Sequence, residues 1–244
     1  ERKQMEQQLI QAEKLSSLGE ILSGVAHELN NPLTAIIGNI SLAQTYLDPD
    51  DKVFLLLSQA LTASKTAKDL TQKLITFSKG GSPDKKVAAV ASLVKNATEF
   101  TLSGSNLKAN FNFPDNLWPV EVDSRQIGQA IHNVIMNARE AMPDGGLLKV
   151  SAENATSDDD LSNLRNGKYV KISIVDFGIG IAQKNLEKIF NPYFSTKKMG
   201  SKKGTGLGLS ICHSIIRKHG GNVTVESKYR HGTTFHIYLP GANG

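Results

Sequence analysis

The chain has 244 residues, a length that most naturally forms two modest domains, and its 39% hydrophobic and 21% charged residues are typical of a globular protein. Its formal net charge of +5, without a long basic run, argues against a nucleic-acid-binding protein. The only cysteine, Cys212, excludes an internal disulfide and a cysteine metal site, and no apolar run approaches the roughly 20 residues of a membrane span. The sequence opens in a charged, heptad-like segment without an initiator methionine. We therefore expect a cytoplasmic fragment of a larger protein, attached to a membrane, if at all, through other parts of its parent.

Two long amphipathic helices are predicted within residues 1–80. Apolar residues recur at steps of three and four over residues 15–29 and again over residues 33–47, which is the pattern of a coiled-coil seam. Pro32 interrupts this seam, and its missing N–H group predicts a bend in the first helix.

A turn and a second helix complete a predicted hairpin. The sequence DPDD at residues 48–51 indicates a turn with a helix N-cap, and a second apolar seam follows over residues 53–77. Glycines and a proline then end the helix, and residues 81–86 form the predicted linker to a second domain. Two such helices leave part of each apolar stripe uncovered, so we expect a homodimer in which two hairpins form a four-helix bundle.

The motif HELNNP places polar residues away from the apolar seam of the first helix. At about 100° per residue, His27 projects nearly opposite the seam, Asn31 lies one turn further on the same face, and Glu28 lies at the flank. This phase disfavours a buried core histidine. A histidine on an ordinary solvated face remains an alternative, but the neighbouring acid, amide and proline favour a reaction centre.

Residues 87–244 are predicted to form a second domain, an α+β sandwich with helices on one face of a mixed sheet. A helix that begins near Ser124 carries a buried face of Ile127, Ile131, Val134, Ile135 and Ala138. Strands are predicted at residues 111–114, 118–123, 145–154 and 169–178, a second helix at 206–219, and a closing hairpin at 222–227 and 233–240.

Two asparagines and a glycine-containing turn are candidate ligand-binding groups. Asn133 and Asn137 lie one helical turn apart, and an amide oxygen is a neutral ligand that Mg²⁺ accepts beside phosphate oxygens. In isolation, surface asparagines are the simpler interpretation. In DFGIGI, Asp176 could accept a hydrogen bond from an exocyclic amine such as that of adenine, while Gly178 and Gly180 let a ligand approach the backbone. An ordinary turn is the alternative.

Two further motifs lie near the predicted second helix of this domain. In IFNPYFSTKK at residues 189–198, aromatic side chains could anchor a loop and Lys197 could contact a phosphate, although a hydrophobic anchor alone explains the aromatics equally well. In GTGLGLS, Gly204, Gly206 and Gly208 lead into a helix whose first N–H groups favour an anion. The run fits neither a dinucleotide-binding βαβ unit nor a phosphate loop that ends in Gly-Lys-Ser/Thr.

The order of these motifs is more specific than any one of them. HELNNP, the two asparagines, DFGIG, FNPYFSTK and GTGLGL resemble, in this order, the H, N, G1, F and G2 boxes of two-component sensor histidine kinases. HELNNPL and TGLGLSI are similar to the subgroup of nitrogen-regulatory sensors. The resemblance covers nearly the whole chain, and it implies a dimerisation and phosphotransfer hairpin followed by a gyrase-type ATP-binding domain.

The resemblance also implies a role for each matching residue. His27 looks like the phosphoacceptor, Glu28 like the acid that takes its proton, and Asn31 like the residue that positions water to dephosphorylate a response regulator. Asn137 resembles the magnesium ligand and Asp176 the adenine-reading carboxylate. The other nucleotide contacts implied are Asn133, Gly178, Gly180, Lys197, Gly204, Gly206 and Gly208. The implied activity is autophosphorylation from ATP and Mg²⁺, followed by transfer to an aspartate of a response regulator.

Two other classes of function account for part of the pattern. A gyrase-type, ATP-driven clamp accounts for the N, G1 and G2 boxes but leaves HELNNP unexplained. A dimeric docking module that binds nucleotide without phosphoryl transfer is the second alternative. Only a kinase accounts for every motif.

Overall fold

The computed structural model describes residues 28–78, 83–157, 164, 166–196 and 206–242. The chain divides into two compact units, Glu1–Gly81 and Ser82–Gly244. Within the described ranges, no helix is both long enough and apolar enough to cross a membrane.

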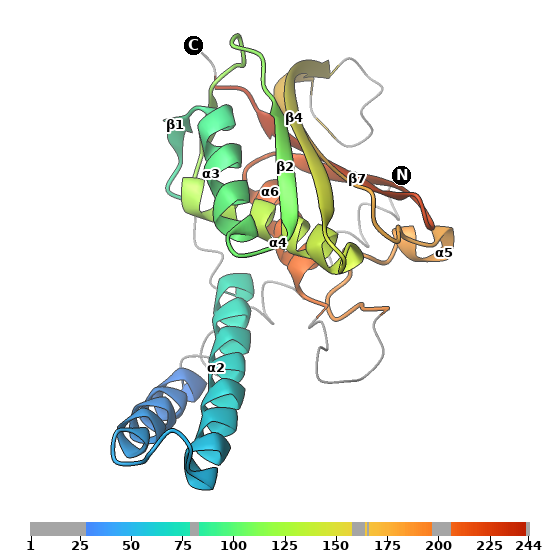
Figure 1. The fold of residues 1–244 in the computed structure, drawn as a ribbon. Helices are drawn as coiled ribbons and strands as arrows, with labels where there is room; N and C mark the ends of the chain where they lie inside the picture. Colours follow the sequence, from blue (N-terminus) through green and yellow to red (C-terminus); the bar gives the residue numbers. More distant parts are fainter. Residues whose placement is uncertain (1–27, 79–82, 158–163, 165, 197–205, 243–244) are drawn as a thin grey trace. The chain divides into compact units, whose positions relative to one another are not determined.

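The first unit is a helical hairpin, as predicted (Figure 1). One helix covers residues 28–44, and α2 covers Lys52–Ser78. Asp51 caps α2, because its carboxylate accepts the backbone N–H of Val53 at 2.9 Å and its carbonyl oxygen accepts that of Leu55 at 3.1 Å. This confirms the turn and N-cap predicted from DPDD.

Large apolar side chains remain exposed along both helices of the hairpin. They are Leu29, Ile36, Leu42, Tyr46, Val53, Leu55 and Leu56. Val53 and Leu56 belong to the predicted seam of α2, yet Phe54 and Leu57 are the more buried of these neighbours. Each helix has only one partner here, so part of its apolar stripe stays in water.

The second unit is built on a five-stranded mixed sheet with the order β2-β4-β5-β7-β6. The strands are β2 Leu107–Asn112, β4 Gly146–Ser157, β5 Gly167–Asp176, β6 Asn222–Lys228 and β7 Gly232–Pro240. β2 and β4 are parallel, and the other neighbours are antiparallel. In the central β5, Val170, Ile172 and Ile174 are buried at every second position, as expected for a strand with one face on the core. The strand predicted at 111–114 in fact begins earlier, at Leu107.

Three helices cover one face of this sheet (Figure 1). They are α3 Val90–Leu102, α4 Ser124–Ala141 and α6 Gly208–Lys218. The central α4 packs against both α3 and α6, and its five predicted core residues are all buried. This confirms the predicted layer of helices on a mixed sheet. The smaller elements are β1 Lys86–Ala88 and β3 Val120–Val122, which pair antiparallel, and α5 Gln183–Leu186.

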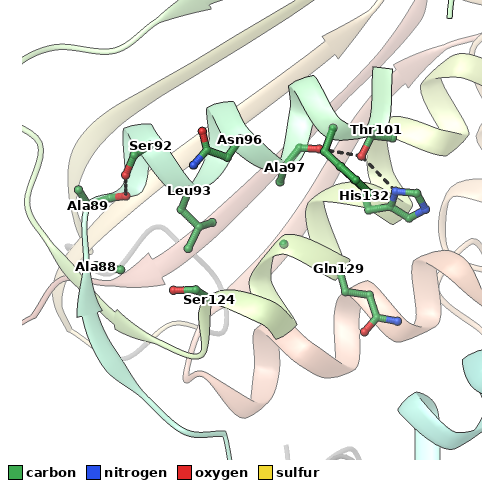
Figure 2. A pocket seen from close by; sticks show the side chains of 12 residues that line it. Ala88, Ala89, Ser92, Leu93, Asn96, Ala97, Thr101, Ser124, Gln129 and His132 are labelled. Carbon is green, nitrogen blue, oxygen red and sulfur yellow. Dashed lines mark hydrogen bonds between the residues drawn. The ribbon is translucent and has the colours of Figure 1, made fainter. Parts of the chain in front are cut away.

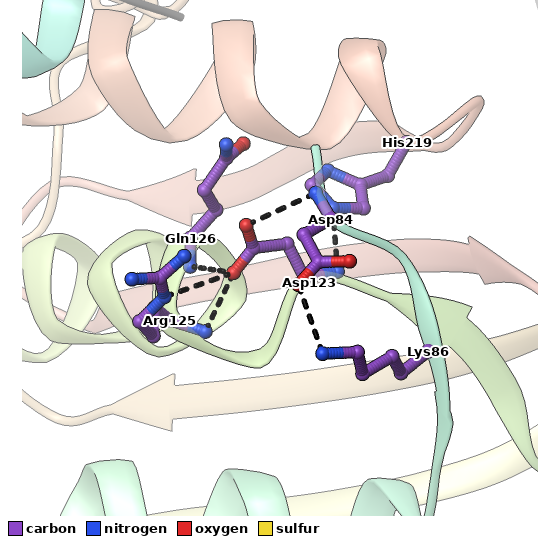
Figure 3. A network of polar contacts seen from close by, with 6 residues as sticks. All are labelled: Asp84, Lys86, Asp123, Arg125, Gln126 and His219. Carbon is purple, nitrogen blue, oxygen red and sulfur yellow. Dashed lines mark hydrogen bonds and ion pairs between the residues drawn. The ribbon is translucent and has the colours of Figure 1, made fainter. Parts of the chain in front are cut away.

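Asp123 organises the beginning of α4 (Figure 3). Its Oδ1 accepts the backbone N–H groups of Arg125 at 3.0 Å and Gln126 at 3.3 Å, which is the geometry of a helix N-cap. Its Oδ2 accepts the backbone N–H of Asp84 at 3.3 Å. The carboxylate therefore joins the segment that leads into β1 to the start of α4.

His219 joins the end of α6 to the same point (Figure 3). Its Nε2 accepts the backbone N–H of Asp123 at 3.0 Å, and its Nδ1 lies 2.8 Å from the carbonyl oxygen of Ile215. Since Nε2 is the acceptor, Nδ1 carries the proton and donates to Ile215. Burial is the main cause of the lowered pKa of His219, which keeps this neutral form.

Candidate functional site

Asn133 and Asn137 lie one turn apart on α4, as their spacing predicted. Asn133 is 9% exposed, and its Nδ2 is the one buried side-chain nitrogen or oxygen without a hydrogen-bond partner among the described residues. Asn137 donates from Nδ2 to the carbonyl oxygen of Asn133 at 2.8 Å, and no described residue donates to its Oδ1. Because a buried amide without a partner is costly, the Nδ2 group of Asn133 is a candidate to bind a ligand.

Asp176 ends β5, and its side chain is fixed by the neighbouring backbone. The residue is 4% exposed, and its Oδ1 accepts the backbone N–H of Gly178 at 2.9 Å and that of Thr233 at 3.2 Å. Burial raises the pKa of this carboxyl above its usual value, while the two N–H groups oppose the rise. Both bonds use the same oxygen, so Oδ2 is left to accept a hydrogen bond from a ligand. The part played by Thr233 was missed, because a backbone donor from another strand leaves no signal in the sequence.

The glycines of DFGIG allow three backbone segments to meet. A methyl group on Gly178 would lie 2.5 Å from the carbonyl oxygen of Ala141, the last residue of α4. Gly180 has a φ of +64°, and a methyl group on it would lie 2.2 Å from the carbonyl oxygen of Lys228. These positions accept only glycine without displacement of the backbone. The turn after Asp176 is therefore packed between the end of α4 and the β6–β7 turn.

The start of α6 lies beside Asn133. A methyl group on Gly208, the first residue of the helix, would lie 3.8 Å from the Asn133 side chain. The N-cap residue Leu207 makes no side-chain capping bond, so among the described residues this N-terminus has no such cap, and its first N–H groups suit an anion. Gly206 has a φ of +66°, and a methyl group there would lie 2.5 Å from the backbone of Tyr193. The F-box and G2-box segments thus touch at Gly206.

The aromatic segment at residues 189–196 is anchored to the same helix. Ile189 is buried, and the rings of Phe190 and His213 contact each other at a tilt of 36°, with their centroids 5.3 Å apart. Burial, with a smaller contribution from Arg217, lowers the pKa of His213, so this ring is held neutral. Phe190 thus packs against α6, while Lys197, the other part of this prediction, lies outside the described residues.

Three of the predicted site residues lie outside the described residues: His27, Lys197 and Gly204. In the hairpin, Glu28 and Asn31 are both exposed on the helix over residues 28–44. Among the described candidates of the second unit, Gly208 at the start of α6 lies beside Asn133, and Gly178 after β5 lies beside Ala141 at the end of α4.

A groove of about 660 Å³ between α3 and α4 is separate from this cluster (Figure 2). It is lined by small and polar side chains together with Leu93 and Phe100, and Phe100 is 82% exposed. Thr101 Oγ1 and His132 Nδ1 lie 3.0 Å apart at its edge. None of the predicted site residues lines this groove, so it is not the site indicated by the motifs.

Comparisons with known proteins match both units of the chain. The model of the histidine kinase-, DNA gyrase B- and HSP90-like ATPase family matches residues 122–243, and the model of the His kinase A (phospho-acceptor) domain matches residues 17–83. The sensor kinase CckA of Brucella abortus is 34% identical over 98% of this chain, which spans 26% of that protein. The signal transduction histidine-protein kinase AtoS of Escherichia coli is 32% identical, again over 98% of this chain and 37% of its own length. The chain therefore spans less than half the length of these two relatives.

Solved structures share the fold. Full-length ShkA, determined in complex with AMPPNP, aligns with a TM-score of 0.75 at 20% identity, over 92% of this chain and 46% of ShkA. The mycobacterial sensor histidine kinase MprB aligns with a TM-score of 0.53 at 25% identity, over 66% of this chain and 99% of the MprB chain. With its phospho-acceptor domain preceding its ATPase domain, the chain belongs to the histidine kinase-, DNA gyrase B- and HSP90-like ATPase family, as the catalytic core of a two-component sensor histidine kinase.

Proposed function

We propose that this chain phosphorylates its own His27 with ATP and then passes the phosphoryl group to an aspartate of a response regulator. One observation carries the proposal: a phospho-acceptor domain that includes His27 and an ATPase domain occur in one chain. Since ATP is the donor, the reaction belongs in the cytoplasm. The chain spans only part of its relatives, so the regulator, and any activity of the whole protein, are parts of the proposal.

The adenine end of ATP is assigned to the end of β5. Oδ2 of Asp176 would accept a hydrogen bond from the exocyclic amine, while Gly178 and Gly180 leave room for the base beside the backbone. The partnerless Nδ2 of Asn133, next to Gly208 at the start of α6, supports a phosphate position there. Lys197, Gly204, Gly206 and Gly208 would border the triphosphate.

Asn137 is assigned as a magnesium ligand. Its amide nitrogen is used within α4, so its oxygen is the atom offered to a ligand, and a neutral amide oxygen suits Mg²⁺. Mg²⁺ would neutralise charge that develops on the phosphate oxygens during transfer. This donor set fits an ion that is held mostly by phosphate oxygens and water.

The transfer itself is assigned to the hairpin. A nitrogen of His27 forms a bond to the γ-phosphorus, the bond from that phosphorus to the bridging oxygen breaks, and ADP leaves. Glu28 takes the proton from the other ring nitrogen, which keeps the attacking nitrogen free. Asn31 would orient water for the dephosphorylation of the regulator. The exposed apolar stripes of the hairpin support a homodimer as the working state.

The test is incubation of the chain with γ-labelled ATP and Mg²⁺, beside the variant His27→Gln. The expected product is an acid-labile, alkali-stable label in the wild type and none in the variant. The exposed His231 gives a matched control, since His231→Gln should be labelled like the wild type. Nucleotide hydrolysis without any label on the protein would reject the kinase and favour a clamp or a docking module.

A further inference from the structure

A polar contact joins the two helices of the hairpin beside the H box. The hydroxyl of Thr71 on α2 lies 2.7 Å from the side-chain oxygen of Asn30. Thr71 is 5% exposed, and Asn30 is half-buried. A part-buried polar contact of this kind favours one alignment of the two helices, because a shift of either helix would leave both groups without a partner.

Two further polar contacts follow the same register along the hairpin. The Nε2 of Gln44 donates to Ser58 Oγ at 2.8 Å, and the Nζ of Lys68 donates to Thr34 Oγ1 at 3.3 Å. Ten residues separate Gln44 from Thr34, and ten separate Ser58 from Lys68, as antiparallel helices of one register require. The Asn30 contact continues this row to the level of HELNNP.

The contacts at the two ends of this row, Gln44 with Ser58 and Asn30 with Thr71, each join a side-chain amide to a hydroxyl that also lies near a backbone carbonyl. Ser58 donates its hydroxyl proton to the carbonyl oxygen of Phe54 at 2.9 Å and accepts from the amide of Gln44. Thr71 likewise lies 2.7 Å from the carbonyl oxygen of Lys68. A hydroxyl has one proton, so a 180° turn of the Asn30 amide would let Thr71 satisfy both neighbours in the same way.

The contact fixes which residues of HELNNP face outward. Asn30 is held toward α2, and at about 100° per residue Asn31 projects to one side, while Glu28 projects about 160° away from Asn30. Both side chains are exposed. A rotation of the helix that released Asn30 would turn both of them by the same angle.

We propose that Asn30 and Thr71 are positioning residues, whose contact holds the H-box turn in the orientation required for phosphoryl transfer to His27. This inference rests on the proposed function. Neither residue is one of the nucleotide-binding residues proposed in the second unit. Their loss should therefore lower the rate of transfer and leave the affinity for ATP unchanged.

The experiment measures the rate of His27 labelling against ATP concentration for the dimeric chain. Thr71→Val keeps the shape of the side chain and removes the hydroxyl. We expect kcat to fall about ten- to a hundredfold, with KM for ATP within about twofold of the wild type, since small misplacements of reacting groups have effects of this size. Thr71→Ser restores the hydroxyl and should recover most of kcat.

Ser58→Ala is the matched control, because it removes the equivalent contact at the turn end of the hairpin. It should keep kcat within about twofold. If Thr71→Val and Ser58→Ala lower kcat equally, the contacts serve general stability and the inference is wrong. It is also wrong if Thr71→Val leaves kcat unchanged.

A second variant, Asn30→Leu, keeps the inference testable if Thr71→Val does not fold. Asn30→Leu removes the other partner at a half-buried site, and circular dichroism and light scattering check that the dimer stays intact. Asn30→Leu alone, and Asn30→Leu combined with Thr71→Val, should then lower kcat no more than Thr71→Val does, because all of these variants remove the same contact. Full activity of a folded Asn30→Leu variant contradicts the inference. Absence of label in the wild type would instead reject the proposed function itself.

Discussion

The Nε2 atom of His219 accepts the backbone N–H of Asp123 at 3.0 Å, so the last turn of α6 is attached to the N-cap of α4. The ring is 2% exposed and has a partner at each nitrogen. These two helices also carry Asn133 and Gly208. The contact therefore helps to fix α4 and α6, which carry part of the candidate nucleotide site.

Replacement of His219 by Ala should destabilise the second unit by roughly 2–4 kcal/mol, because it leaves a cavity and a buried N–H group without an acceptor. Urea unfolding followed by circular dichroism measures this change. His231→Ala, at an exposed histidine, should change the free energy of unfolding by less than about 0.5 kcal/mol. Equal effects of the two variants would contradict the role given to His219.

The same contact predicts a loss of stability in mild acid. Burial lowers the pKa of His219, and Lys85 adds to this, while Ile215 and Asp123 oppose it. The unfolded chain then binds the proton at a higher pH than the folded chain. The contribution of neutral His219 to the free energy of unfolding is thus fully present above about pH 6.5, and it is lost as the pH falls toward the lower pKa of the folded state.

Melting temperatures of the wild type and His219→Gln between about pH 8 and pH 5 test this linkage. The wild type should lose more stability on acidification than the variant. Burial also lowers the pKa values of His213 and His236, so both proteins share that part of the decline. Parallel curves would mean that His219 does not contribute.

Asp176→Asn should weaken ATP binding by about ten- to a hundredfold, since a hydrogen bond to an ionised carboxylate is worth roughly 1.5–3 kcal/mol. Calorimetric titration with ATP measures the loss.

Burial raises the pKa of Asp176, so the ionised form is lost at a higher pH than for an exposed aspartate. Affinity for ATP should therefore begin to fall at a correspondingly higher pH. The free energy of unfolding should instead rise as the pH falls through this range, because protonation removes the cost of the buried charge. Unchanged affinity in Asp176→Asn would exclude this carboxylate as the adenine contact.

Two glycines of the second unit should respond oppositely to alanine. A methyl group on Gly178 would lie 2.5 Å from the carbonyl oxygen of Ala141, so Gly178→Ala must displace the turn after Asp176 and lower both stability and ATP affinity. Gly128 lies within α4, and nothing lies within 4 Å of a methyl group placed there. Gly128→Ala should stabilise the unit by up to about 1 kcal/mol, since alanine is the better helix former. Thermal melts should show a lower melting temperature for Gly178→Ala and a higher one for Gly128→Ala than for the wild type.

The sequence predicted the elements with strong internal patterns. The apolar spacing along α4 identified the helix and its five buried residues, and the apolar content of residues 169–178 identified the strand β5. The boundaries of α2 also agree with the predicted seam, because Asp51 provides a local capping signal. Each of these features depends on neighbours in sequence, which is why they could be read without a structure.

Features that depend on distant residues were not predicted. α3 was missed, and β1 begins at Lys86, inside the segment assigned to the linker. The pairing of β1 with β3 and the bond from His219 to Asp123 join residues far apart in the chain, and no local pattern encodes them. Of the candidate site, Asp176 and the asparagines were nominated by type and spacing. The N–H group of Thr233 and the contact of Asn30 with Thr71 required the fold.

Disruption of the exposed apolar stripe on α2 should abolish self-association. Leu56 is 58% exposed in the single hairpin, and Val53 lies one turn before it. Burying such leucines against a second hairpin is worth roughly 1.5–3 kcal/mol each, so Leu56→Lys, which places two charges at a two-fold interface, should convert the dimer to a monomer. Light scattering measures the mass, and circular dichroism confirms that the hairpin remains helical. Thr62→Lys adds the same charge to an exposed position outside the stripe and should stay dimeric. A Leu56→Lys protein of dimeric mass would show that this stripe is covered by something other than a second copy of the chain.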